Sequence, residues 1–81
     1  MPILKIKLVD ASGHALPGQT VVVSDNGQLQ SNADGIVQFL LGEPALVSIE
    51  VNGLPAWAGR SDQLAREEEF QQGGSGFARV S

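Results

Sequence analysis

Short apolar runs separated by glycine-bearing turns are the feature that most limits what this chain can fold into. Four such turns, SG, LPG, DNG and ADG, fall within residues 11–35. Glycine and proline at this density interrupt helices, and Asn-Gly and Asp-Gly pairs favour tight turns between strands. Turns recur about every 8 to 12 residues, which is typical of an antiparallel sandwich or small barrel.

The runs between these turns have the composition and period of strands. Residues 3–9 alternate, with Lys5 and Lys7 on one face and apolar residues on the other, which predicts a half-buried strand. Because outward lysines discourage pairing with other molecules, we expect this strand at a sheet edge. Further strands are predicted at 20–23, 28–31, 36–41, 45–51 and 54–58. Of these we expect 36–41 to be central and Leu29 to point inward from 28–31.

Two Asn-Gly pairs predict hairpins between successive strands. Asn26 with Gly27, and Asn52 with Gly53, can adopt the positive φ angles of a type I′ turn. Pro55 follows the second pair and has no N–H to donate to a neighbouring strand. The strand that contains it is therefore expected to be short, bulged or at an edge.

The composition changes after Gly59. Good helix formers over 61–70 predict a short helix, capped by Ser61 or Asp62 and dependent on Leu64 and Phe70 finding a surface to cover. The sequence QQGGSG then reads as a flexible joint, and FARVS as a last strand. That strand either completes the chain's own sandwich or adds to a neighbouring subunit's sheet.

The length sets the domain organisation, because 81 residues suffice for one domain and not two. Within it we distinguish a β-sandwich body over 1–59, an acidic segment over 60–72 that is helical in part, and a glycine joint with the last strand over 73–81.

Composition argues against several classes of protein. Nine acidic and five basic side chains give a net charge of −4, which leaves no basic face for nucleic acid. No apolar run approaches the roughly 18 residues that span a bilayer, so we expect no membrane insertion. The N-terminus lacks the pattern of a secretory signal, so we expect a cytoplasmic protein as made, with signal-independent export as an alternative.

The residues available for catalysis are few. There is no cysteine or tyrosine, and the single histidine, His14, lies in a loop where we expect a solvated side chain. We therefore predict a protein that is not an enzyme and that uses no metal or cofactor. Asp10, Asp25 and Asp34 lie beside turns, which they either stabilise or, as an alternative, use to bind calcium.

The remaining candidates concern contacts with another protein or with copies of this chain. Trp57 is either core or a partly exposed anchor, and the run of three glutamates is either a solvated helix face or a docking site for a basic partner. The detachable tail adds aromatic and basic candidates. The candidate interaction residues are Pro55, Trp57, Glu67, Glu68, Glu69, Phe70, Phe77 and Arg79.

Residues 6–51 resemble the carboxypeptidase regulatory-like, or transthyretin-related, β-sandwich family. The resemblance runs through a first strand ending at Asp10, then GHALPG, a valine strand, SNADG, an apolar strand with Phe39, and VSIEVNG. It covers a little over half of the chain. It implies an all-β fold: a small antiparallel Greek-key, immunoglobulin-like sandwich of about seven strands.

The resemblance also implies a function, because such domains are generally non-catalytic and support other domains or mediate protein contacts. The related hydroxyisourate hydrolases end in YRGS and use several histidines, and the related intradiol dioxygenases bind iron through tyrosine and histidine. This chain ends in FARVS, with one histidine and no tyrosine. We therefore predict a non-enzymatic interaction or structural subunit that binds a larger assembly or itself.

Two alternatives stay open. One is a component of a phage-like or contractile secretion apparatus. The other is a module that binds an ion or small ligand through its turn aspartates.

Overall fold

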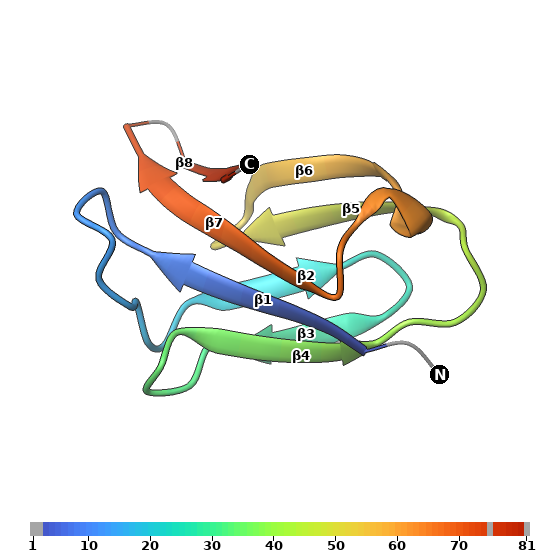
Figure 1. Ribbon diagram of the computed structural model, residues 1–81, viewed down its shortest axis with the longest axis horizontal. Coiled ribbons are helices and arrows are strands. Elements are labelled where there is room, and N and C mark those ends of the chain that lie inside the picture. The colour runs from blue at the N-terminus through green and yellow to red at the C-terminus, as the bar shows by residue number, and fades with distance from the viewer. Residues whose placement is uncertain (1–2, 75, 81) are drawn as a thin grey trace.

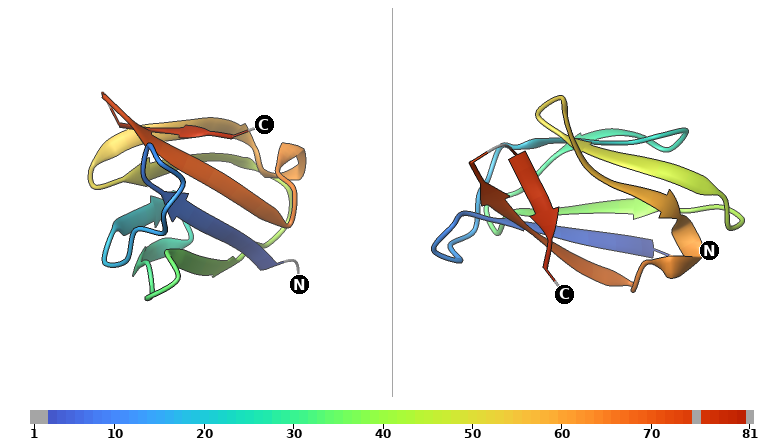
Figure 2. Two further views of the ribbon diagram at one scale, coloured as in Figure 1. Left: turned by 60° about the vertical axis from the view of Figure 1, so that its left-hand side comes forward. Right: turned by 90° about the horizontal axis from the view of Figure 1, so that it is seen from above.

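The computed structural model describes residues 3–74 and 76–80 and shows two four-stranded sheets packed face to face (Figures 1 and 2). The front sheet, which faces the viewer in Figure 1, has the order β4-β1-β7-β8, and the back sheet has the order β3-β2-β5-β6. The strands are β1 (Ile3–Val9), β2 (Thr20–Val23), β3 (Gly27–Gln30), β4 (Ile36–Leu40), β5 (Leu46–Val51), β6 (Leu54–Arg60), β7 (Glu67–Gly73) and β8 (Gly76–Arg79).

The expected all-β sandwich is confirmed, with two differences in detail. The described residues form eight strands rather than about seven. The front sheet is also mixed, because β1 pairs with β7 in parallel while the other pairs in both sheets are antiparallel.

The prediction of a helix over 61–70 is wrong. A single 3-10 turn, η1, spans Ser61–Gln63, and β7 begins at Glu67. Local helix propensity is a weak preference that tertiary pairing overrides, and β7 lies between β1 and β8 in the centre of the front sheet. Glu68 and Phe70 face inward while Glu67 and Glu69 face outward, which is the period of a strand.

The expectation that residues 3–9 form an edge strand is also wrong, because β1 lies between β4 and β7. Lys5 and Lys7 lie directly opposite Glu67 and Glu69 in the parallel register, and Lys5 Nζ is 3.6 Å from Glu67 Oε1. Opposite charges at facing positions favour the pairing of two strands. The lysines therefore serve a strand–strand contact inside the sheet.

Both expected hairpins form. Asn52 (φ 55°) and Gly53 (φ 83°) make a two-residue loop between Val51 and Leu54, as the Asn-Gly pair predicts. The β2–β3 loop is one residue longer, and its positive φ angles lie at Asp25 and Gly27 rather than at Asn26 and Gly27. The hairpin prediction is thus confirmed, but the turn is not type I′ at that position.

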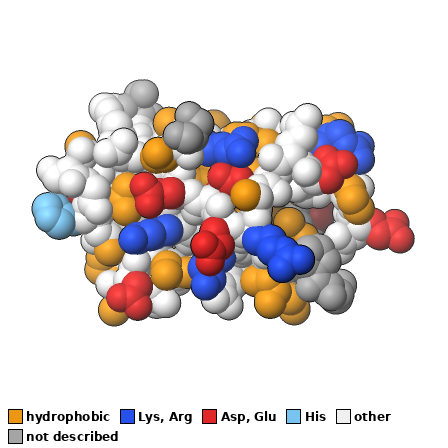
Figure 3. Space-filling view, in the orientation of Figure 1, with side chains coloured by type: hydrophobic (Ala, Val, Ile, Leu, Met, Phe, Trp, Pro, Cys, Tyr) orange, Lys and Arg blue, Asp and Glu red, His pale blue; other side chains and the backbone are white. Residues whose placement is uncertain are grey.

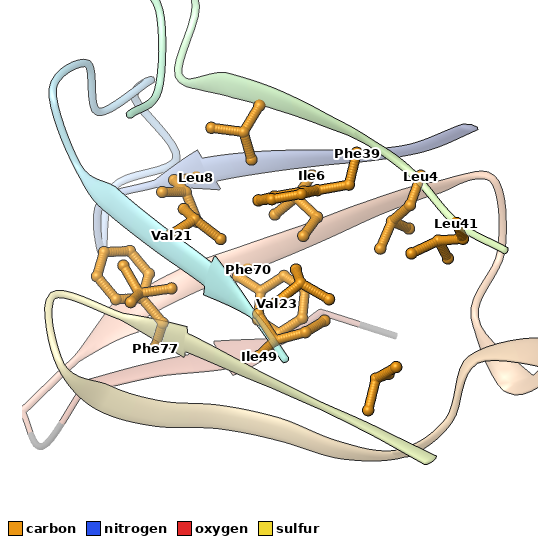
Figure 4. Packing of buried hydrophobic residues seen from close by; sticks show 13 residues of the cluster. Leu4, Ile6, Leu8, Val21, Val23, Phe39, Leu41, Ile49, Phe70 and Phe77 are labelled. Carbon is orange, nitrogen blue, oxygen red and sulfur yellow. The ribbon is translucent and has the colours of Figure 1, made fainter. Parts of the chain in front are cut away.

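The core lies between the sheets and draws on both (Figure 4). Leu29 lies opposite buried Val21 and so faces inward, yet it is 45% exposed because β3 is an edge strand. The buried hydrophobic cluster consists of Leu4, Ile6, Leu8, Val21, Val23, Val37, Phe39, Leu41, Val47, Ile49, Val51, Phe70 and Phe77.

The β3–β4 connection carries the chain from the back sheet to the front sheet at Gly35. Its φ is 74°, and a Cβ on this residue would lie 2.6 Å from the Leu8 carbonyl oxygen. Leu8 N–H donates to the Gly35 carbonyl at 2.7 Å. Glycine therefore allows the connection to pass close against β1.

Candidate interaction surface

Several of the candidate interaction residues lie inside the molecule. Phe70 and Phe77 are both buried in the core. Glu68 is buried as well: its Oε2 accepts the Ala65 N–H at 2.7 Å, and its Oε1 accepts the Arg79 Nε–H at 2.9 Å. Glu68 and Arg79 therefore tie β8 to the segment before β7.

The run of glutamates consequently does not form one acidic helix face. Glu67 is exposed and Glu69 is half-buried on the outer face of the front sheet, opposite the two lysines of β1. Figure 3 shows acidic and basic side chains interspersed over this face. The charges are thus mixed, with no patch of a single sign.

Trp57 combines features of both alternatives considered for it. It is half-buried, packs against the core cluster and lies opposite buried Ile49. Its ring covers Gly59, where a Cβ would lie 3.0 Å from Trp57 Cη2. Exposed Pro55 lies beyond a bulge in β6, which is an edge strand, so the expectation for this strand is confirmed.

Asp10 organises a loop. Its Oδ1 accepts the N–H groups of Ser12 (2.8 Å) and His14 (2.9 Å). The His14 hydrogen bond is the largest cause that lowers the Asp10 pKa below its ordinary value of 3.8. The His14 side chain is exposed, as expected, with Nδ1 3.7 Å from Asp10 Oδ2. Within residues 3–74 and 76–80, no three His, Asp or Glu side chains cluster as a metal site would require.

An apolar groove of about 240 Å³ lies at the end of the sandwich where β1 begins. It runs between the β4–β5 loop and the segment after η1. Its apolar lining comes from Ile3, Leu4, Leu41, Pro44, Leu64 and Ala65.

The free edge of β4 is the surface with the clearest capacity to bind a chain. Residues 36–41 were expected to be central, but β4 is the outermost strand of the front sheet. β7 takes the place on the far side of β1, so β4 has one neighbour (Figure 1).

Backbone hydrogen bonds show which β4 groups face this edge. Leu8 N–H donates toward β4, at Gly35, whereas Lys5 N–H donates toward β7, at Arg66 O (2.8 Å). Because these directions alternate along a strand, even-numbered β1 residues bond β4. Their partners in the register, Phe39 and Val37, therefore point to β1.

The N–H and C=O groups of Ile36, Gln38 and Leu40 must then point outward. Those of Ile36 are satisfied by Asn32, whose Oδ1 accepts the Ile36 N–H and whose N–H donates to the Ile36 carbonyl, both at 3.0 Å. Among the residues that the structure describes, the outward groups of Gln38 and Leu40 have no partner. Two donors and two acceptors are therefore available side by side.

Side chains leave this edge open. β4 carries no charged residue, and Leu40 is 62% exposed beside Ile3, its cross-strand neighbour, which is 48% exposed. The other edges are less accessible: β6 contains the bulge and Pro55, and β8 lies against β6. β3 has four residues, of which only Leu29 is large and apolar. Natural proteins usually protect edges with charge, proline or bulges, and β4 has none of these.

None of the models of known protein families matches this chain, and the curated proteins compared with it contain no significant match. In the described part of the chain, no helix has the length and apolar character needed to cross a membrane.

Proposed function

We propose that this protein is an interaction module that binds an extended segment of a partner protein along the free edge of β4. The observation that carries this proposal is the pair of outward-facing residues, Gln38 and Leu40, whose backbone groups have no partner within the described chain. An added strand would accept and donate hydrogen bonds there, which is the chemistry of β-strand addition.

The partner's chemistry follows from the side chains around this edge. Leu40 and Ile3 offer adjacent apolar surface on the outer face of the front sheet, and Gln38 offers an uncharged polar group. An uncharged segment with apolar residues at alternate positions suits this surface best, because side chains alternate between the two faces of a strand.

Two further arguments support a binding role without catalysis. The resemblance of residues 6–51 to carboxypeptidase regulatory-like domains points to a family whose members generally mediate contacts. The catalytic inventory of the sequence is also small, with one histidine and neither cysteine nor tyrosine. Membership of that family and the absence of catalysis are parts of the proposal.

Selection from a library of random displayed peptides tests the proposal. We expect the wild-type protein to recover peptides with alternating apolar residues, and the Leu40→Lys variant to bind them at least about tenfold more weakly, a loss of about 1.4 kcal/mol. Leu40 is exposed, so lysine there spares the core; it acts by removing apolar surface from the contact and by placing a charge at the edge where the segment pairs.

The Ala58→Lys variant is the matched control. It places the same charge at an exposed residue of β6, which is an edge strand of the other sheet. It should bind the selected peptides as the wild type does. Peptides that bind all three proteins equally, or a selection that yields no Leu40-dependent peptide, would contradict the proposal.

A further inference from the structure

We propose that the segment bound along β4 is β4 of a second copy of this chain, paired antiparallel about a two-fold axis at Phe39. This inference rests on the proposed function and narrows it, because it names the partner and the register. It follows from which backbone groups are free and from where β4 ends.

The free groups define the register. Outward N–H and C=O groups without partners belong to Gln38 and Leu40 within the described residues. If Gln38 of one copy lies opposite Leu40 of the other, each residue exchanges two hydrogen bonds with its counterpart, as in a hydrogen-bonded antiparallel pair. By symmetry the second pair forms at the same time, and all the free donors and acceptors are used. The centre of that arrangement is Phe39 opposite itself.

A register centred on Gln38 would satisfy fewer groups. It would place Leu40 of one copy opposite Ile36 of the other, and the Ile36 groups are already bonded to Asn32 at 3.0 Å. One Leu40 N–H and one carbonyl would then stay unpaired in each copy. Of these two registers, hydrogen bonding favours the one centred on Phe39.

The length of β4 also fits that register. Asn32 occupies the edge beside Ile36, where an added strand could not continue. In the Phe39-centred pair, the residue of the second copy opposite Ile36 is Gly42. β4 ends at Leu40, before that position is reached, and the chain then leaves for β5 in the back sheet. The paired segment thus stops before it would meet Asn32.

Charge and apolar surface are compatible with self-pairing. A two-fold contact brings each residue near its own copy, so charged residues at its centre would repel each other. β4 has none, and its five residues are Ile, Val, Gln, Phe and Leu. The two exposed Leu40 side chains would each lie beside Gln38 of the other copy and near each other across the axis, which removes apolar surface from water.

Such a dimer is small. Four backbone hydrogen bonds and two leucines place it among weak interfaces, and we expect a dissociation constant of roughly 10 µM to 1 mM. The dimer must therefore be sought at high protein concentration.

Sedimentation equilibrium and amide exchange by nuclear magnetic resonance, from about 20 µM to 2 mM protein, test the inference. We expect a concentration-dependent dimer in which exchange of the Gln38 and Leu40 amides slows as the paired fraction rises, by at least about twofold at 2 mM protein. The Ile36 amide should be protected at every concentration, because Asn32 already binds it. Leu40→Lys should be monomeric throughout, and Ala58→Lys should dimerise as the wild type does.

Three results would overturn the inference: a wild-type monomer at 2 mM, a dimer that Leu40→Lys leaves intact, or protection that rises with concentration at amides other than those of Gln38 and Leu40. The exchange measurement needs no variant, so a Leu40→Lys protein that failed to fold would not remove the test. The proposed function fails separately. A monomeric protein that still selects Leu40-dependent peptides keeps the β4 edge as a binding surface, with a partner other than itself.

Discussion

At the scale of single residues, polar side chains in this domain organise turns and ends. Asp10 caps the loop after β1 through the Ser12 and His14 amides, and Asn32 closes the outer end of β4 by bonding Ile36. The sequence predicts that asparagine and aspartate at strand ends are turn residues. It does not predict which groups they hydrogen-bond, because those partners depend on the path of each loop. The role of Asn32 in limiting the free edge to two residues is one such contact.

Asp10 gives the stability a dependence on pH. Its pKa is lowered in the folded state, mainly by the His14 N–H, so its carboxylate stabilises the fold fully above the ordinary pKa of 3.8 and progressively less as pH falls through the folded value. We expect Asp10→Asn to lower the unfolding free energy more at pH 6 than at pH 2.5, and chemical-shift titration of the wild type to place the Asp10 pKa below 3.8.

Asp34→Asn controls for the loss of one negative charge in the Asp10 test, because Asp34 is an exposed residue of a different turn. An equal effect of Asp10→Asn at both pH values would show that the carboxylate charge makes no contribution through these amides.

At the scale of elements, strands marked by local signals such as tight turns and alternating apolar residues are predicted from the sequence. A strand whose formation depends on a partner distant in the sequence is not. β2, β5 and β6 lie close to their expected ranges, because β-branched runs and Asn-Gly turns are local signals. The sequence predicts a helix where β7 begins, because its glutamates are good helix formers and its partner β1 lies far away in the sequence. That single error also hid the candidate surface: without β7 beside β1, nothing indicated that β4 would be the edge.

The β3–β4 connection yields a prediction at this scale. Gly35→Ala should lower the unfolding free energy by at least about 2 kcal/mol, because alanine is disfavoured at φ 74° and its Cβ would lie 2.6 Å from the Leu8 carbonyl. Chemical denaturation of the two proteins measures the difference.

Gly18→Ala is the matched control for Gly35→Ala. Gly18 has nearly the same φ, 73°, but a Cβ there would meet no atom within 4 Å. Gly18→Ala should therefore lower the unfolding free energy only by the cost of placing alanine at this backbone conformation, about 1–2 kcal/mol. Equal losses for the two variants would mean that the approach of Gly35 to β1 is not a close one.

At the scale of the whole molecule, the C-terminal strand belongs to the domain's own sheet. β8 pairs with β7, contributes Phe77 to the core and lies against β6 of the back sheet. The sequence left two alternatives for the C-terminal strand, and the structure confirms that the strand completes the sandwich of its own chain. The sequence predicts a flexible joint over QQGGSG, but Gln71–Gly73 are the end of β7, and the paired register continues to Gly73 opposite Gly76.

The contact between Glu68 and Arg79 should matter for the whole fold. Arg79→Ala leaves the buried Glu68 carboxylate with the Ala65 N–H and without its charged partner. We expect it to lower the unfolding free energy by about 1–3 kcal/mol. Arg66→Ala, at an exposed residue just before β7, should change it by less than about 0.5 kcal/mol. Thermal or urea unfolding that ranks the two variants equally would contradict this role for Arg79.

The parallel pairing of β1 with β7 has a consequence for synthesis of the chain. The strand at the centre of the front sheet, which begins at Ile3, acquires its second neighbour only when residues 67–73 have been made. Contacts between such distant segments form slowly, since a long loop must close first. A nascent chain would therefore expose the β7-facing edge of β1 until residues 67–73 have emerged and paired with it.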